Sequence, residues 1–198
     1  MTQWVENPVG GRERGPRGLA RAWTEVLVRP RRFFRNGVAP GDQAPGLVFG
    51  VLVVLVATAT RLALVPAARP DVAGGPLVSS FLVLAVAGLL VAPLVLHLVA
   101  ALQTLFLLAV VPADQRGGVS ETVQVLAYAA APCVLAGLPI PALQVACGAY
   151  GAALLAIGIA ERNGIPLWQS VLLTLLPSAL VFGYGFQAFA AASVLLSG

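Results

Sequence analysis

His97 is the only acidic, basic or histidine side chain that the sequence places well inside a long apolar stretch. Every Asp and Glu lies in a loop or at the end of such a stretch, and Arg61 stands near an end, where its stem can snorkel outward. A histidine at that depth can relay protons, but it more often makes one structural hydrogen bond between helices. We therefore favour a structural role for His97.

No other grouping of reactive side chains has a recognisable spacing. The chain has one histidine, so it cannot supply a three-ligand zinc site from a His-Glu-x-x-His helix. It also has no Gly-x-Ser-x-Gly elbow and no phosphate-binding loop that ends in lysine. An intramembrane hydrolase would need a serine or Cys133 within reach of His97. The sequence predicts a non-enzymatic protein without catalytic residues, cofactor or metal, and with Cys133 and Cys147 as buried free thiols.

The composition indicates the environment in which these residues fold. Of the 198 residues, 59% are hydrophobic and 10% are charged, and the mean hydropathy is +0.90. A water-soluble domain has roughly 25% charged residues, so most of this chain must lie in lipid. We expect an all-α integral membrane bundle of five transmembrane helices, preceded by an amphipathic interfacial helix. The predicted spans cover about 46–65, 77–98 with an extension to 111, 121–137, 142–160 and 167–196.

The apolar stretch 77–111 is the hardest to divide. As one helix its 35 residues would be about 50 Å long, which exceeds a single crossing, yet two crossings with a turn need more residues. We expect one crossing that continues into the interface, with a kink at Pro93.

The first 45 residues carry most of the charge. Residues 1–18 are predicted to be a disordered basic segment, and 19–45 an amphipathic juxtamembrane helix followed by a linker. An ordinary polar arm is the alternative. Basic residues beside a membrane span more often set topology or contact anionic head groups than bind nucleic acid. The candidate membrane-interface residues are Trp23, Arg29, Arg31, Arg32, Phe33, Phe34 and Arg35.

The twelve basic residues, all arginine, predict the orientation. Eight precede residue 36, and Arg116 and Arg162 fall on the same side if the chain crosses five times. Only Arg61 and Arg69 fall on the other side. The asymmetry predicts a multi-pass protein of the plasma membrane with a cytoplasmic N-terminus.

The small and polar residues inside the predicted spans indicate close helix packing more strongly than a binding cavity. Gly148 and Ala152 stand four residues apart in the fourth predicted span, a spacing that lets helices approach closely. The candidate intramembrane polar residues are His97, Gln124 and Tyr128. If they surrounded a polar cavity, the protein would be a small-molecule or lipid transporter.

Several local patterns, in their order along the chain, resemble one family. AWTEVLVRPRRFF, from Ala22 to Phe34, precedes the first span, and ETVQVLAYAAAP, from Glu121 to Pro132, opens the third. With His97 late in the second span and a short Pro-rich turn after the third, this is similar to the Yip family (Ypt/Rab-interacting proteins) in its prokaryotic branch. The resemblance implies five helices, a cytoplasmic N-terminus and no catalytic residues. Eukaryotic relatives bind Rab-type GTPases or shape trafficking membranes.

The leading hypothesis is a non-enzymatic membrane scaffold or adaptor of the Yip type. Its partners would be the lipid bilayer, anionic lipid head groups at the cytoplasmic face, and an unidentified protein or a second copy of the chain. The transporter remains the alternative.

Overall fold

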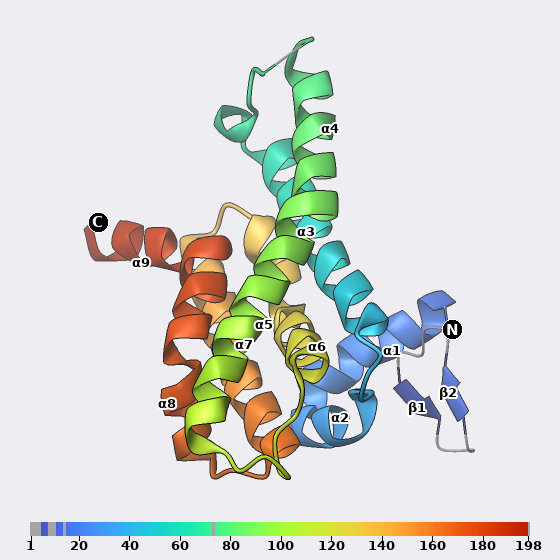
Figure 1. Ribbon diagram of the computed structural model, residues 1–198. Helices are drawn as coiled ribbons and strands as arrows, with labels where there is room; N and C mark the ends of the chain where they lie inside the picture. Colours follow the sequence, from blue (N-terminus) through green and yellow to red (C-terminus); the bar gives the residue numbers. More distant parts are fainter. Residues whose placement is uncertain (1–4, 8–10, 14, 73, 198) are drawn as a thin grey trace.

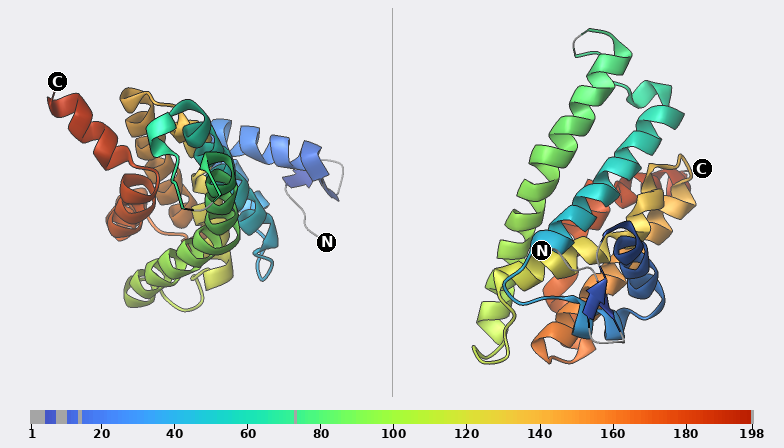
Figure 2. Two further views of the ribbon diagram at one scale, coloured as in Figure 1. Left: turned by 90° about the horizontal axis from the view of Figure 1, so that it is seen from above. Right: turned by 90° about the vertical axis from the view of Figure 1, so that its right-hand side faces the viewer.

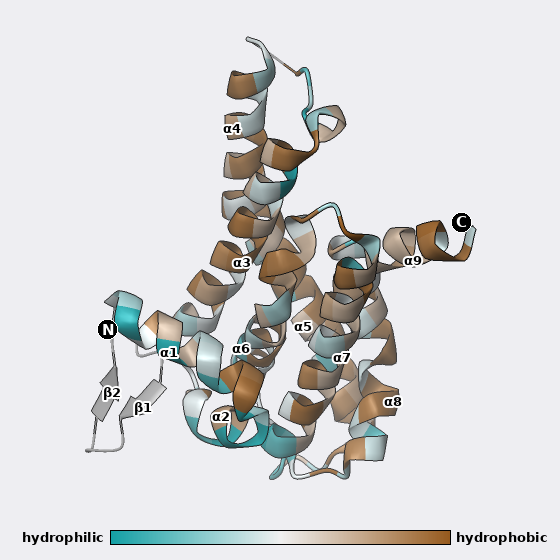
Figure 3. Cartoon of the chain, turned by 180° about the vertical axis from the view of Figure 1, so that it is seen from behind, coloured by the Kyte–Doolittle hydropathy of each residue, from teal (hydrophilic) through white to brown (hydrophobic). Residues whose placement is uncertain are grey.

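The computed structural model describes residues 5–7, 11–13, 15–72 and 74–197, most of which are helical (Figure 1). Among the described residues, four helices are long and apolar enough to cross a membrane, and the number is five when a bent pair of helices is counted as one span. The predicted all-α bundle of membrane-spanning helices is therefore confirmed. Figure 3 shows that hydrophilic residues gather at α1, at α2 and at the adjoining end of the bundle, whereas apolar residues dominate the rest.

Two long helices lie side by side and run in opposite directions (Figure 2). The first, α3, covers Ala44–Leu64. The short 3₁₀ helix η1, Pro66–Ala68, follows it, and a single apolar helix of 35 residues then runs from Pro76 to Val110. The shared end of this pair projects beyond the other helices, and most α4 side chains there are exposed.

The 35-residue helix contains a change of helical type near the predicted kink. It consists of α4, the π-helical segment η2 and α5, which cover Pro76–Val86, Ala87–Val91 and Ala92–Val110. Pro93 has no N–H to donate to the preceding turn, and a locally widened helix is one way to accommodate that loss.

The third predicted span is bent. It consists of α6, Val119–Ala129, and the 3₁₀ helix η3, Ala131–Gly137, whose axes differ by 48°. Every residue of α6 from Thr122 to Ala129 is buried, so this helix lies at the centre of the bundle.

The last part of the chain differs from the prediction of one span over 167–196. After α7, Pro141–Asn163, the chain forms α8, Leu167–Ser178, and the π-helical η4, Ala179–Gly185. Two residues after η4, Gln187 has a φ of 62°, which lies in the left-handed region and ends a regular helix. The remaining helix α9, Ala188–Ser197, begins against α7 and then points sideways, away from the bundle (Figure 2).

The N-terminal elements are also more regular than predicted. Strands β1, Val5–Asn7, and β2, Gly11–Glu13, pair antiparallel with Val5 opposite Glu13. Helix α1 already begins at Gly15 and ends at Val28, and a second helix, α2, covers Pro30–Gly37. The rest of the predicted disordered segment, residues 1–4, 8–10 and 14, lies outside the described residues.

Glycines on α7 allow its neighbours to approach closely, as its small-residue spacing predicts. A Cβ on Gly148 would lie 2.6 Å from that of Ala188, and one on Gly151 would lie 2.6 Å from the Phe182 ring. About two turns later, Gly158 faces Phe34. Packing of this kind holds helices together in lipid, where hydrophobic burial supplies little drive. Cys133 and Cys147 are free and buried, as predicted.

Candidate functional site

Helix α2 presents a charged surface at one end of the bundle. Phe33 and Phe34 are almost fully buried, whereas Arg31, Arg32 and Arg35 are exposed. The helix begins at Pro30, whose fixed φ suits a first helical position. Its sequence therefore separates into an apolar side that packs on the protein and a basic side that faces outward.

The aromatic residues among the predicted interface residues, Trp23, Phe33 and Phe34, all contact other parts of the protein. The Phe33 ring packs edge-on against Tyr128, with ring centroids 4.8 Å apart, and against Phe34 at 5.6 Å. Trp23 lies 4.6 Å from Phe49 and its indole Nε1 donates to the carbonyl oxygen of Ala131 at 3.1 Å. The aromatic side of the N-terminal helices therefore contacts protein, because α6 provides an aromatic ring and η3 provides a carbonyl acceptor.

A second contact fixes the end of α1 on the bundle. The hydroxyl of Tyr150 donates to the carbonyl oxygen of Leu27, close to where α1 ends. Together with the indole of Trp23, this bond joins the N-terminal helices to η3 and α7. The predicted juxtamembrane segment is therefore docked on the protein.

Two arginines of α2 share one carboxylate. Arg31 and Arg35, one turn apart, lie 3.4 and 2.7 Å from the two oxygens of Glu161 near the end of α7. The Glu161 side chain is only 12% exposed, while both arginines are about two-thirds exposed. Arg29 and Arg32 are exposed and form no ion pair within the described part of the chain. The surface thus keeps a net positive charge after pairing.

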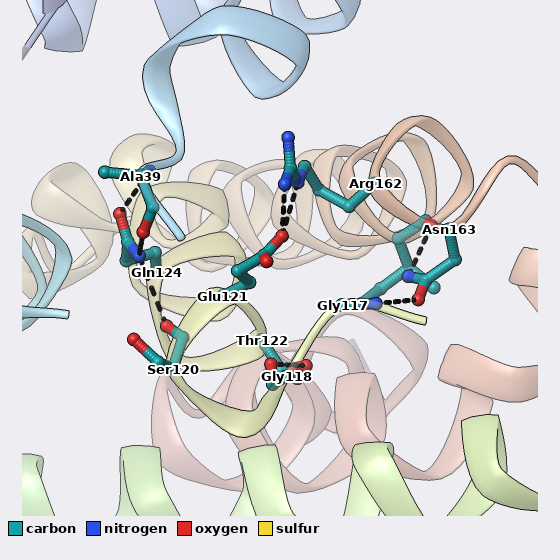
Figure 4. Close-up of polar contacts among 10 residues, drawn as sticks. Ala39, Gly117, Gly118, Ser120, Glu121, Thr122, Gln124, Arg162 and Asn163 are labelled. Atoms are coloured by element: carbon teal, nitrogen blue, oxygen red, sulfur yellow. Dashed lines mark hydrogen bonds and ion pairs between the residues drawn. The ribbon is translucent and has the colours of Figure 1, made fainter. Parts of the chain in front are cut away.

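Glu161 is the site residue that the sequence analysis missed. It stands in the segment Glu161–Gly164, which we interpreted as a break between spans. Its sequence signal is weak: one acid stands at the end of an apolar helix, beside Arg162. The same segment contributes a second ion pair, in which Arg162 Nε donates to Glu121 Oε2 at 2.8 Å (Figure 4).

Loop backbone at this end is held by buried amide side chains. Asn163 accepts a hydrogen bond from the N–H of Gly117 at 3.0 Å (Figure 4). Gln124, on α6, accepts from the N–H of Ala39 at 3.1 Å and donates to the carbonyl oxygen of the same residue at 2.7 Å. One fully buried side chain therefore fixes both polar groups of a residue in the linker between α2 and α3.

Gln124→Leu is expected to lower the free energy of unfolding by about 1–3 kcal/mol, because Ala39 would lose partners for a donor and an acceptor. Denaturant titration of the full chain in mixed micelles measures the change. Gln169→Leu, on α8, is the matched control and should leave stability nearly unchanged. Equal stability of the two variants would show that the Ala39 contacts do not hold the linker.

The three intramembrane polar candidates do not meet at one place. The Nδ1 atom of His97 lies 2.7 Å from the carbonyl oxygen of Pro93, one turn earlier on the same helix. Tyr128 packs its ring between Phe33 and Phe49, and Gln124 binds the linker. Each side chain is therefore occupied by a different neighbour. Across the described ranges, no group of three or more His, Cys, Asp or Glu residues is placed to hold a metal ion.

Comparison with known proteins identifies a family. The family model for the Yip1 domain matches residues 24–189, which include α2, all the spanning helices and the Glu161 segment. No curated protein and no solved structure is detectably similar to the chain.

Proposed function

The chain belongs to the Yip1 domain family, and from this premise we propose that it is a non-enzymatic membrane scaffold or adaptor. It would organise lipids or partner proteins at the cytoplasmic face of a prokaryotic plasma membrane. The observation that carries the proposal is the arrangement of α2. Buried phenylalanines hold this helix rigidly on the bundle while its arginines face outward.

The distribution of arginine supports a cytoplasmic position for the α2 end. Arg116 and Arg162 lie in or beside the loops at this end, together with the α2 arginines, whereas Arg61 and Arg69 lie at or beyond the opposite end of α3. Basic residues next to spanning helices concentrate on the cytoplasmic side of membranes. Unpaired arginines there attract the anionic lipids of the inner leaflet.

Replacing both Arg29 and Arg32 by glutamine tests the lipid part of this proposal. Full-length protein with a fluorophore at its N-terminus is reconstituted into vesicles that contain labelled phosphatidylglycerol or labelled phosphatidylcholine. Energy transfer then reports which lipid collects near the protein. We expect the excess of phosphatidylglycerol to fall by about half, because each arginine near the surface contributes separately to the attraction.

The matched control is the double change of Arg29 and Arg32 to lysine, which keeps the charge and should keep the lipid excess. Added salt should reduce the excess for the unmodified protein. An excess that survives the glutamine changes would rule out lipid recruitment by α2.

The transporter hypothesis required His97, Gln124 and Tyr128 to converge on a cavity accessible to water. Their separate contacts with Pro93, with Ala39 and with the Phe33 and Phe49 rings remove that support.

A further inference from the structure

A half-open cavity of about 270 Å³ lies beside α3, away from the α2 end. Its volume is close to the lower end of the roughly 300–1,000 Å³ that is typical of small-molecule sites. On α3 its lining runs along one helix face from Gly50 through Ala57 to Arg61, a length of about 16 Å. The cavity is thus long, and its walls are apolar except at the Arg61 end.

The irregular backbone of the fold gathers around this cavity. Lining residues include Val91 from π-helical η2, Gly137 from η3, and Val181 and Gly185 from π-helical η4. Gln187, with its left-handed φ of 62°, also lines it. π-helical segments and non-glycine residues with positive φ are frequent at functional sites, and within membranes such backbone is tolerated where it lines a cavity.

The polar end of the cavity holds a cation without a counter-charge. The Nη1 of Arg61 donates to Oε1 of Gln187. Gln187 is neutral, and no carboxylate lies within ion-pair distance of Arg61 among the residues that the structure describes. The guanidinium keeps donors for an anion, and the Gln187 amide adds another.

We propose that this cavity binds one phospholipid with an anionic head group. One acyl chain lies along the α3 face between Gly50 and Ala57, and the phosphate contacts Arg61 and Gln187. A lipid fits the lining better than a soluble anion, since an ion alone would leave the long apolar part unfilled. The position of Arg61 near the end of α3 places the phosphate at the edge of the bilayer, where head groups lie.

The test counts lipid molecules retained by full-length protein in a non-ionic detergent, by native mass spectrometry. The probes are phosphatidylglycerol and phosphatidylcholine with the same acyl chains. We expect the unmodified protein to prefer phosphatidylglycerol by about tenfold, and Arg61→Gln to abolish the preference. Arg116→Gln, which removes a charge elsewhere, should keep it.

A side chain that fills the cavity tests whether an acyl chain lies in it. Thr58→Phe adds a ring to a lining position, whereas Val56→Phe adds the same ring to an exposed position on the same helix. We expect Thr58→Phe to weaken binding of both lipids by about tenfold and Val56→Phe to have no effect. Equal binding by these two variants would overturn the proposal, as would displacement of the bound lipid by inorganic phosphate.

Two further results separate the proposed binding from a folding defect and from lipid binding at α2. If the Thr58→Phe protein does not fold, the Arg61→Gln protein alone tests the proposal. An Arg61→Gln protein that still prefers phosphatidylglycerol over phosphatidylcholine overturns it. The Arg29→Gln, Arg32→Gln protein should still bind phosphatidylglycerol tightly in detergent. If it loses that binding while Arg61→Gln keeps it, the lipid belongs to the α2 end instead.

Discussion

Replacing Phe34 by alanine is expected to lower the free energy of unfolding by about 3–5 kcal/mol, the usual cost of removing a buried phenylalanine ring. Phe34 has no exposed surface, and its ring fills the space opposite Gly158 on α7. A cavity at this point would also loosen α2, whose other anchor, Phe33, packs against the Phe34 ring. Denaturant titration in mixed micelles would measure the loss.

The control is Phe81→Ala on α4, because Phe81 is 72% exposed. Its loss should change stability by less than about 0.5 kcal/mol. Limited proteolysis between α1 and α3 should be faster in Phe34→Ala than in the unmodified protein. A Phe34→Ala protein as stable as the Phe81→Ala protein would mean that α2 does not dock on α7 as described.

The second large effect is expected at Gly137, where η3 touches α3. A Cβ at this position would overlap the carbonyl oxygen of Ala57 and lie 2.9 Å from the Cβ of Thr60. Because a backbone atom cannot rotate away, Gly137→Ala must push the two segments apart, at a cost of about 3 kcal/mol. The melting temperature of the detergent-solubilised protein should fall clearly.

Gly118→Ala serves as the control for Gly137→Ala, since a Cβ at Gly118 meets no atom within 4 Å and its φ is negative. That variant should melt like the unmodified protein. The two alanine changes differ only in what surrounds the new methyl group, so equal melting would disprove the close contact between η3 and α3.

The presence of several membrane-length apolar helices could be predicted from the sequence, because hydropathy and the spacing of Gly and Pro are local signals. The long helix around His97 and the break at Pro30 follow from such local signals. The environment of an apolar helix face could not be predicted. The spacing of Trp23, Phe33 and Phe34 shows that they share a side, but lipid and protein are both apolar partners, and only the tertiary arrangement decides between them.

The same limit applies to the candidate sites. Arg31 and Arg35 were predicted at the surface, but their partner Glu161 lies 126 residues or more away in the sequence. The cavity beside Arg61 depends on two π-helical segments and on the φ of Gln187, none of which has a reliable local sequence signature.

The 35-residue helix from Pro76 to Val110 has a consequence for where the protein can reside. Its apolar length of about 52 Å far exceeds the roughly 30 Å of an average hydrocarbon layer. Such a hydrophobic mismatch is relieved by steep tilting or by local thickening of the bilayer, each at an energetic cost that grows with the difference. We therefore expect the stability of the protein to depend on bilayer thickness.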